Sequence, residues 1–442
     1  MRTHATRRAT QSGVDTALLH RPVAVWGVPL ERRDGPSEGS TCLVQFRQDV
    51  SLAGVWRQAD NECSDSLAGL DKSVMDEQLL GLAHARATPV EVMRAILRMP
   101  VDLLWNGGIG TYVKSSEERN SEIGDRANDA LRVDGRELRA RVVGEGGNLG
   151  FSQRGRIEYA SHGGRINTDF VDNSAGVNTS DIEVNLKIML AEPAGARVPR
   201  GKARVRLLSS VTGEVAAQVL RNNYLQSEAL SLLQARSTQD LGDHQQLMRA
   251  LERGGEMNRA LECLPSDSDI EERSQRGEGL TRPELAVLLA WSKLALNQSL
   301  TDTDIASDPY HAGELERYFP KAWRRRYARA IAGHRLRRQL VATATTNSIL
   351  NRMDPGFVMR MSAQTGVDTA AVARAYTIAR DSAGLRELWS EVEALDNRVA
   401  AATQYEALLA TRDYVEQLTR RLVLGRGRGP KADIGAEVRR LA

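Results

Sequence analysis

The stretch VVGEGGNLGFSQRGR, residues 142–156, places a short β-branched run directly before a cluster of glycines and an asparagine. Short apolar runs that end at turn residues are typical of buried strands. Glycine has no Cβ, so its backbone can approach another group closely. The pattern predicts a strand whose carboxyl end lies against a flat or anionic group. The function predicted for the chain depends on the identity of that group.

A second strand with the same ending is expected about forty residues upstream. VDLLW, residues 101–105, is a short apolar run, which predicts a strand buried on both faces, and the glycine-rich NGGIG follows it. Before it, Thr88 and Glu91 have the spacing of a capping box and predict a helix over residues 88–97. A helix and a turn are expected in residues 125–138. Strand, helix and strand in succession predict a parallel sheet.

Two helices are expected after the glycine cluster. The first begins at Ser152, and residues 164–169 could then form a further strand. The second begins at Thr179 or Ser180, because Glu183 has the spacing to complete a capping box with Ser180. Serine is a frequent N-cap because its hydroxyl accepts a hydrogen bond from a free amide of the first turn.

Beyond residue 202 the strand pattern disappears, and the long segments carry apolar residues at spacings of three and four. The predicted fold class is therefore α/β followed by all-α, a partial Rossmann-like parallel sheet domain with a large C-terminal helical domain. The expected parts are a poorly ordered or non-homologous leader (residues 1–70), the partial nucleotide-binding domain (71–200), the helical domain (201–425) and a flexible tail (426–442).

Composition excludes several classes of protein. The chain is 41% hydrophobic and 26% charged, which is ordinary for a globular protein. Its 60 basic and 57 acidic residues nearly balance, so no overall field favours nucleic acid or anionic lipid. The three cysteines, Cys42, Cys63 and Cys263, lack metal-ligand spacing, so neither zinc nor disulfides are expected. Since no signal peptide or membrane span is apparent, a cytoplasmic location is expected.

Both glycine-rich segments, residues 106–114 and 144–150, are candidates for ligand binding, because ligands of open parallel sheets bind outside the carboxyl ends of the strands. Each segment could equally be only a tight turn. The dinucleotide fingerprint is absent, since Val113 and Leu149 stand where its third glycine would be. A pyrophosphate would have to bind elsewhere.

A third candidate segment is DNSAGVNTSDIEVN, residues 172–185. Asn173 and Asn178 tolerate left-handed turns, and Ser180 is expected at the positive end of a helix. A substrate carboxylate could be held by the Ser180 hydroxyl and nearby amides. The alternative is that Ser180 only caps its helix.

Three other features have mainly structural explanations. His162 is expected at the end of a helix, where the helix dipole favours a cation. Lys114 follows a glycine-rich loop and could be a base or a surface lysine. In the basic run of residues 320–340, Trp323 and Tyr327 lie four residues apart, which favours core packing over stacking on nucleic-acid bases. A solvated or subunit-facing basic surface is preferred there.

Four stretches together resemble the large bacterial NAD-specific glutamate dehydrogenases, whose chains are several times longer. They are PVDLLWNGGIGTYVK, GDRANDALRVDGREL, VVGEGGNLG and HGGRINTDFVDNSAGVNTSD, and the resemblance continues through LTRPELAVLLAWSKL and HRLRRQLVATATTNSILNRM. The resemblance covers roughly residues 70–420. It implies oxidative deamination of L-glutamate by NAD to 2-oxoglutarate and ammonia, in a homo-oligomeric enzyme.

The resemblance also implies roles for particular residues. Glu145, Gly146 and Asn148 match the turn beside the nicotinamide riboside, and Asn173 matches the part that touches the nicotinamide amide. Val177 is expected against the carbon chain of glutamate, and Ser180 on its side-chain carboxylate. The sequence departs from the usual pattern at Ala175, Asn178 and Thr179, which stand where relatives have glycine, aspartate and cysteine.

No catalytic lysine, catalytic acid or pyrophosphate fingerprint can be assigned in this chain, because in the family they lie in upstream segments. A truncated enzyme is therefore expected, with no metal and no membrane partner. The alternative is a non-catalytic helical module that uses its basic 320–340 surface for oligomer or RNA contacts. From charge alone nucleic acid is the less expected partner.

Overall fold

The computed structural model describes residues 23–28, 41–45, 88–108, 110–191, 201–425 and 433–442. It divides into two units, each compact in itself. The first runs to Ser174 and includes Thr281–Ala286, and the second comprises Ala175–Leu280 and Val287–Ala442. No helix in the described ranges is both long and apolar enough to cross a membrane.

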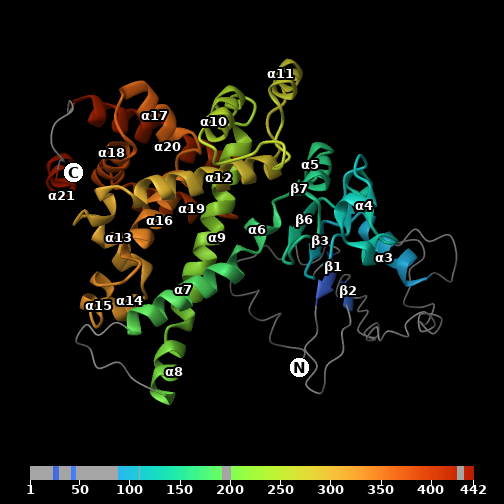
Figure 1. Cartoon of the computed structure of the whole chain (residues 1–442), viewed down its shortest axis with the longest axis horizontal. Coiled ribbons are helices and arrows are strands. Elements are labelled where there is room, and N and C mark those ends of the chain that lie inside the picture. Colours follow the sequence, from blue (N-terminus) through green and yellow to red (C-terminus); the bar gives the residue numbers. More distant parts are fainter. Residues whose placement is uncertain (1–22, 29–40, 46–87, 109, 192–200, 426–432) are drawn as a thin grey trace. The chain divides into compact units, whose positions relative to one another are not determined.

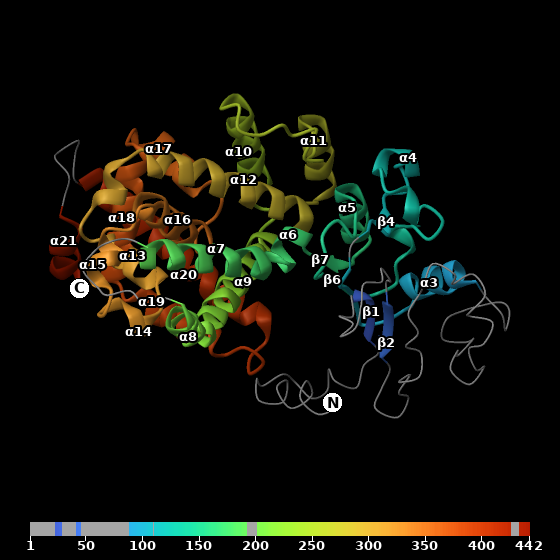
Figure 2. The same cartoon turned by 60° about the horizontal axis from the view of Figure 1, so that its bottom comes forward.

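The first unit is built on a five-stranded sheet with the order β2-β1-β3-β6-β7 (Figure 1). Figure 2 shows β1 beside β2. β1 and β2 are antiparallel, and the other neighbouring strands are parallel. A separate two-stranded parallel sheet pairs β4 with β5. The strands are β1 (Val23–Val28), β2 (Thr41–Gln45), β3 (Leu103–Asn106), β4 (Val113–Lys114), β5 (Val133–Asp134), β6 (Val142–Glu145) and β7 (Arg165–Ile166).

Two helices of this unit begin where their capping residues predict. The Thr88 backbone amide donates to Glu91 and the Glu91 amide donates back to the Thr88 hydroxyl, which confirms the expected capping box. Ser152 caps the next long helix by accepting from the Gly155 amide. The helices are α3 (Pro89–Leu97), α4 (Asn120–Ile123), α5 (Gln153–Ser161) and α6 (Asp169–Asp172), with short 3₁₀ turns at Arg126–Asn128 and Gly135–Glu137.

The connection between β3 and β6 differs from the prediction. Residues 125–138 form two 3₁₀ turns and the short strand β5 instead of a helix and a turn. Polar side chains compete with helical hydrogen bonds here. Asp125 accepts from the Thr111 amide, and the buried Arg132 donates to the carbonyls of Thr111 and Asp125. These bonds tie the segment to the preceding loop.

The core of the first unit lies on one face of the sheet. Leu104 of β3 and Val143 of β6 are buried with Tyr159 of α5 and Ile166 of β7 in one hydrophobic cluster. Trp105, on the other face of β3, is 37% exposed. The expectation of a strand buried on both faces is therefore wrong for β3, because Trp105 is left open to solvent.

The second unit is entirely helical in its described part, as predicted for the chain beyond residue 202 (Figure 1). Its longer helices are α7 (Ser174–Ala191), α9 (Thr212–Ala235), α10 (Leu241–Arg253), α12 (Arg282–Thr301), α16 (Arg337–Leu350), α18 (Thr369–Ser382) and α20 (Ala401–Gly425). The shorter ones are α8 (Lys202–Ser209), α11 (Asp267–Arg276), α13 (Ala312–Tyr318), α14 (Lys321–Arg324), α15 (Ala328–Ala332), α17 (Phe357–Thr365), α19 (Leu385–Glu393) and α21 (Ile434–Leu441), with a 3₁₀ turn at Asp304–Ser307.

These observations confirm the predicted fold class, a small parallel sheet followed by many helices. The predicted domain boundaries stay predictions. Most of the expected leader lies outside the described residues, and its described pieces form β1 and β2. Within the expected tail, Asp433 caps α21, which packs against α18.

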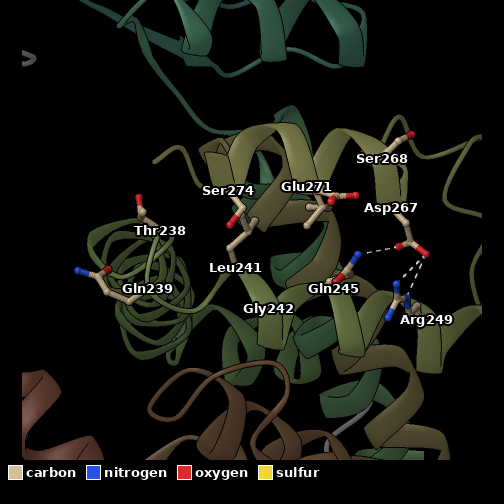
Figure 3. A pocket seen from close by; sticks show the side chains of 11 residues that line it. Thr238, Gln239, Leu241, Gly242, Gln245, Arg249, Asp267, Ser268, Glu271 and Ser274 are labelled. Carbon is tan, nitrogen blue, oxygen red and sulfur yellow. Dashed lines mark hydrogen bonds and ion pairs between the residues drawn. The ribbon is translucent and has the colours of Figure 1, made fainter. Parts of the chain in front are cut away.

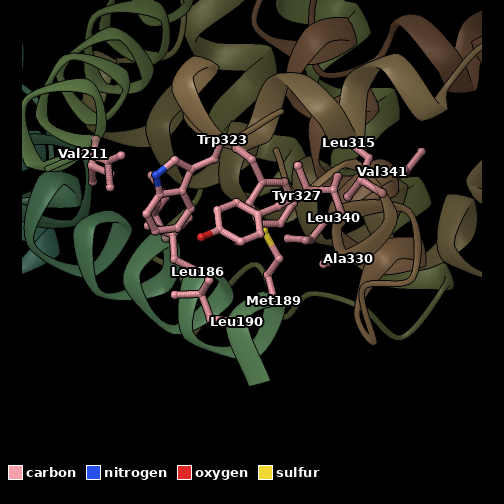
Figure 4. Packing of buried hydrophobic residues seen from close by; sticks show 14 of the residues in the cluster. Leu186, Met189, Leu190, Val211, Leu315, Trp323, Tyr327, Ala330, Leu340 and Val341 are labelled. Carbon is pink, nitrogen blue, oxygen red and sulfur yellow. The ribbon is translucent and has the colours of Figure 1, made fainter. Parts of the chain in front are cut away.

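Buried aromatic residues hold α14 and α15 in place. Trp323 and Tyr327 point into a cluster with Leu186, Met189 and Val211 (Figure 4). Their rings meet edge to face with centroids 5.5 Å apart. This packing confirms that the two aromatic residues of the basic run belong to the core.

Replacing Trp323 by alanine should lower the free energy of unfolding of the second unit by about 3–5 kcal/mol, because a buried ring is lost and a cavity remains. Arg325→Ala, two residues away and exposed, should change it by less than about 0.5 kcal/mol. Urea unfolding followed by far-UV circular dichroism measures both. Similar losses in the two variants would contradict the packing.

Candidate functional site

The carboxyl ends of β3 and β6 meet at one edge of the sheet. Asn106 and Glu145, the last residues of the two strands, are paired in parallel register. The Gly147 amide donates to the Asn106 carbonyl at 2.8 Å. The two glycine-rich segments that follow these strands therefore lie side by side, as the predicted parallel sheet requires.

The group above the glycines is the protein's own Trp105. A Cβ built on Gly144 would lie 2.6 Å from the indole of Trp105, and one on Gly146 would lie closer still. A Cβ on Gly147 would meet the Gly108 carbonyl. The interpretation that these glycines leave room for an external flat ligand is therefore wrong, because the indole and the neighbouring backbone occupy that space.

Glu145 is fully buried and is held by Arg156 of α5. Arg156 Nε donates to one carboxylate oxygen at 2.7 Å and Nη2 donates to the other at 2.9 Å. Burial raises the pKa of the Glu145 carboxyl to about 7. The side chain points into the protein, so Glu145 can present only its backbone to a ligand.

Carboxylates of the segment that follows β7 hold the turn of residues 145–149. Asp172 accepts from the Glu145 amide and Asp169 accepts from the Leu149 amide, both at 2.9 Å. Asn173 Nδ2 donates to Asn148 Oδ1, also at 2.9 Å. The structure thus brings together Asn148 and Asn173, two of the residues predicted to bind the cofactor.

Val177 and Ser180 lie on α7 in the second unit, and both are exposed. The predicted start of this helix at Thr179 or Ser180 is wrong, since α7 begins at Ser174. Ser180 therefore lies inside the helix, where its hydroxyl donates to the Gly176 carbonyl at 3.4 Å. Because Ser180 does not lie at the N-terminus of the helix, the helix dipole gives no reason to expect an anion there. The exposed hydroxyl of Ser180 is the feature that could still contact a substrate carboxylate.

Two other candidate side chains have local partners. Lys114 Nζ lies 2.5 Å from Asp134, its register partner across β4 and β5. His162 is the C-cap of α5, and its Nδ1 lies 2.8 Å from the Glu158 carbonyl. Both arrangements agree with structural roles.

The second unit contains a pocket of about 630 Å³ between α10 and α11 (Figure 3). Its wall is polar, but Asp267 already accepts from Gln245, Arg249 and Arg259. Hydrogen bonds from Arg259 lower the pKa of Asp267 to about 2. None of the predicted site residues lines this pocket, so the candidate site remains the 145–149 turn.

Comparison with known protein families shows to which family the chain is related. Residues 66–233 match the model of the bacterial NAD-glutamate dehydrogenase catalytic domain, and residues 277–442 match that of the glutamate dehydrogenase C-terminal region. The chain belongs to the bacterial NAD-specific glutamate dehydrogenase family.

Its relatives in the family are much longer. Proteins named NAD-specific glutamate dehydrogenase are 47% identical over 344 residues in Halomonas elongata, 48% over 319 residues in Pseudomonas aeruginosa and 40% over 360 residues in Mycobacterium tuberculosis. The alignments cover 78%, 72% and 81% of this chain but only 21%, 20% and 22% of the relatives.

Sequence reasoning missed the residues that hold the turn in this member of the glutamate dehydrogenase family. The sequence indicates Trp105 only as part of an apolar strand, although its register partner is Gly144. No motif in the sequence indicates a role for Arg156, Asp169 or Asp172. The sequence gives only a weak indication of these residues. Arg156 is a charged residue inside a short predicted helix, and Asp169 and Asp172 are two acids three residues apart.

Removing Arg156 should strongly destabilise the turn, because it leaves a buried carboxylate without its partner. Arg156→Met should cost about 3–5 kcal/mol, and Glu145→Leu combined with Arg156→Met should recover much of that loss. Hydrogen–deuterium exchange of the peptide that contains residues 143–149 measures the effect locally.

The matched control for this variant is Arg141→Met, which removes an exposed arginine 3.0 Å from Asp102 in the same unit. It should cost less than about 1 kcal/mol. Equal exchange rates in the Arg156 and Arg141 variants would contradict the assigned role of Arg156.

Gly146→Ala should destabilise the first unit by about 1–3 kcal/mol because the added methyl group meets the indole of Trp105. The same substitution should cost less in a Trp105→Ala background. Gly213→Ala is the control, since a Cβ at Gly213 in α9 meets nothing within 4 Å. Thermal unfolding of the four variants measures the coupling, and strictly additive losses for Gly146 and Trp105 would argue against the contact.

Proposed function

We propose that this chain supplies the nicotinamide side of a glutamate dehydrogenase site, where L-glutamate is oxidatively deaminated by NAD to 2-oxoglutarate and ammonia. The main support is the hydrogen bond between Asn148 and Asn173, which joins two segments that the family resemblance relates to the cofactor. The names of the relatives agree with this chemistry.

The turn of residues 145–149 suits the nicotinamide end of NAD better than the pyrophosphate. Its Glu145 and Leu149 amides already donate to Asp172 and Asp169, so they cannot bind a phosphate, and the two carboxylates would repel one. Asn148 Oδ1 accepts from Asn173 Nδ2, which leaves a donor on Asn148 and an acceptor on Asn173. The carboxamide of nicotinamide has both N–H donors and a carbonyl acceptor, so it can pair with one acceptor and one donor of the protein.

Bound NAD would supply the acceptor for the hydride that leaves Cα of glutamate. The residues of this chain would bind the cofactor and orient it. Arg156 keeps the Glu145 carboxylate inside the protein, and Asp169 fixes the backbone of Leu149. The exposed Val177 and Ser180 are proposed to contact the carbon chain and the distal carboxylate of glutamate.

No residue of this chain is assigned as the catalytic lysine or acid. A homo-oligomeric state and a cytoplasmic location are part of the proposal, by relationship to the family. Gly146 is proposed to act through its backbone, since Trp105 covers the position of its missing side chain.

Saturation-transfer NMR on the purified chain with NAD tests which end of the cofactor is bound. Protons of the nicotinamide ring should receive more saturation than those of adenine, and Asn148→Ala and Asn173→Ala should both reduce the transfer. Thr179→Ala serves as a control, because the Thr179 hydroxyl donates to the Ala175 carbonyl within its own helix. Stronger transfer to adenine would contradict the proposal.

When the upstream segments of the family are supplied in trans, Ser180→Ala should raise the KM for glutamate about tenfold or more, the effect of losing a hydrogen bond to a charged group. The KM for NAD should change less. Initial rates of NAD reduction, with each substrate varied in turn, give both constants. A larger change in the KM for NAD would show that Ser180 does not contact glutamate.

A further inference from the structure

The segment between Glu316 and Asp354 contains no aspartate or glutamate, although basic residues recur along it. Several of its arginines are engaged in the fold. Arg324 donates to the Phe319 carbonyl, and Arg338 donates to the carbonyls of Thr301 and Thr303. These contacts cap neighbouring helices and turns and are sufficient to explain the two arginines.

Four other cations are not explained in this way. Lys321, Arg325, Arg326 and Arg329, which we call the basic row, are exposed. None of them forms an ion pair with a carboxylate in the part of the chain that the structure describes. Arg326 lies over the ring of Tyr327, with its guanidinium carbon 5.4 Å from the ring centroid. Glu214 lies beside the row, where it accepts from the backbone amide of Lys321.

The row spans two short helices, α14 and α15, and the turn of residues 325–327 between them. The Tyr327 amide donates to the Trp323 carbonyl, and the Ile331 amide donates to the Tyr327 carbonyl. Lys321, Arg325 and Arg329 recur every four residues along this segment. Trp323 and Tyr327 are buried and fix these turns to the core (Figure 4). Like charges close together repel one another, and a bound anion would reduce that repulsion.

A second basic helix packs on the same hydrophobic cluster. Leu207 and Leu208 of α8 and the adjoining Val211 contact the cluster that contains Trp323. Lys202 and Arg206 of α8 are exposed and also lie four residues apart, and α8 contains no acid. The cations of α8 and of the basic row are thus carried by elements anchored in one core.

The composition of the surface indicates the kind of partner. Stable protein interfaces need a desolvated centre, usually with aromatic or aliphatic side chains. No large hydrophobic residue is exposed between residues 321 and 340. The two aromatic rings of the segment are buried, so they cannot stack on bases. A polyphosphate backbone requires only cations.

We propose that the basic row binds the phosphate backbone of a nucleic acid without reading its sequence. The net charge of +3 gave no reason to expect such a partner. Although acids nearly balance bases over the sequence, no acid in the described residues forms an ion pair with these four side chains. The predominance of arginine fits phosphate, to which a guanidinium donates two parallel hydrogen bonds.

Fluorescence anisotropy with a labelled single-stranded RNA of roughly 20 nucleotides tests the proposal at several salt concentrations. Four phosphate contacts predict a slope of about −3 for the logarithm of the association constant against that of salt. Replacing Lys321, Arg325 and Arg329 by glutamine should weaken binding at least about tenfold at low salt and reduce the slope by about 2.

The control is Arg253→Gln, Arg398→Gln and Arg421→Gln, which removes the same charge from exposed arginines on other elements. Its binding should change by less than about twofold. If the basic-row triple variant does not fold, Arg329→Gln alone should reduce the slope by about 0.7.

Equal effects of the two triple variants, absence of binding at low salt, or a slope near zero would overturn the proposal. So would salt-sensitive self-association that depends on the basic row without RNA binding, because the partner would then be an acidic protein surface.

Discussion

The ion pair between Glu145 and Arg156 is the constraint on which the candidate site depends. A carboxylate this deeply buried is costly unless its hydrogen-bonding capacity is satisfied, and Arg156 binds both of its oxygens. The pair draws the end of β6 against α5. Arg156 also lies 3.3 Å from Asp169, which accepts from the Leu149 amide. One arginine therefore links the strand, the turn and the segment that carries Asn173.

The same network determines what the turn can bind. Its first and last amides already donate to carboxylates of the protein, so the glycine-rich sequence does not form a phosphate-binding loop. The polar side chains that remain at the turn are those of the exposed Asn148 and the half-buried Asn173. This arrangement suits an uncharged or cationic ring with a carboxamide.

Local signals in the sequence were sufficient for much of the fold. The capping residues Thr88 and Ser152 and the short apolar runs of β3 and β6 act within a few residues, so α3, α5 and the two parallel strands could be predicted. The start of α7 could not. Ser180 and Glu183 have the spacing of a cap, but such residues are also tolerated inside a helix, where a serine hydroxyl can bond to the carbonyl four residues earlier.

The site was harder to predict than the fold for a related reason. Glycines after a strand show that something lies close, but not whether it is a ligand or a side chain of the same protein. Here the group is the indole of Trp105. Its place above the glycines depends on the pairing of β3 with β6, which local sequence patterns do not reveal. The family resemblance identified Asn148 and Asn173, whereas the acids and the arginine that position them are visible only in three dimensions.

A crystal structure of the chain with NAD would test the central claim most directly. The account predicts the nicotinamide carboxamide against Asn148 and Asn173, with Glu145 still bound to Arg156 and the pyrophosphate away from Asp169 and Asp172. A pyrophosphate seated on the 145–149 turn, or a nicotinamide in contact with neither asparagine, would contradict it.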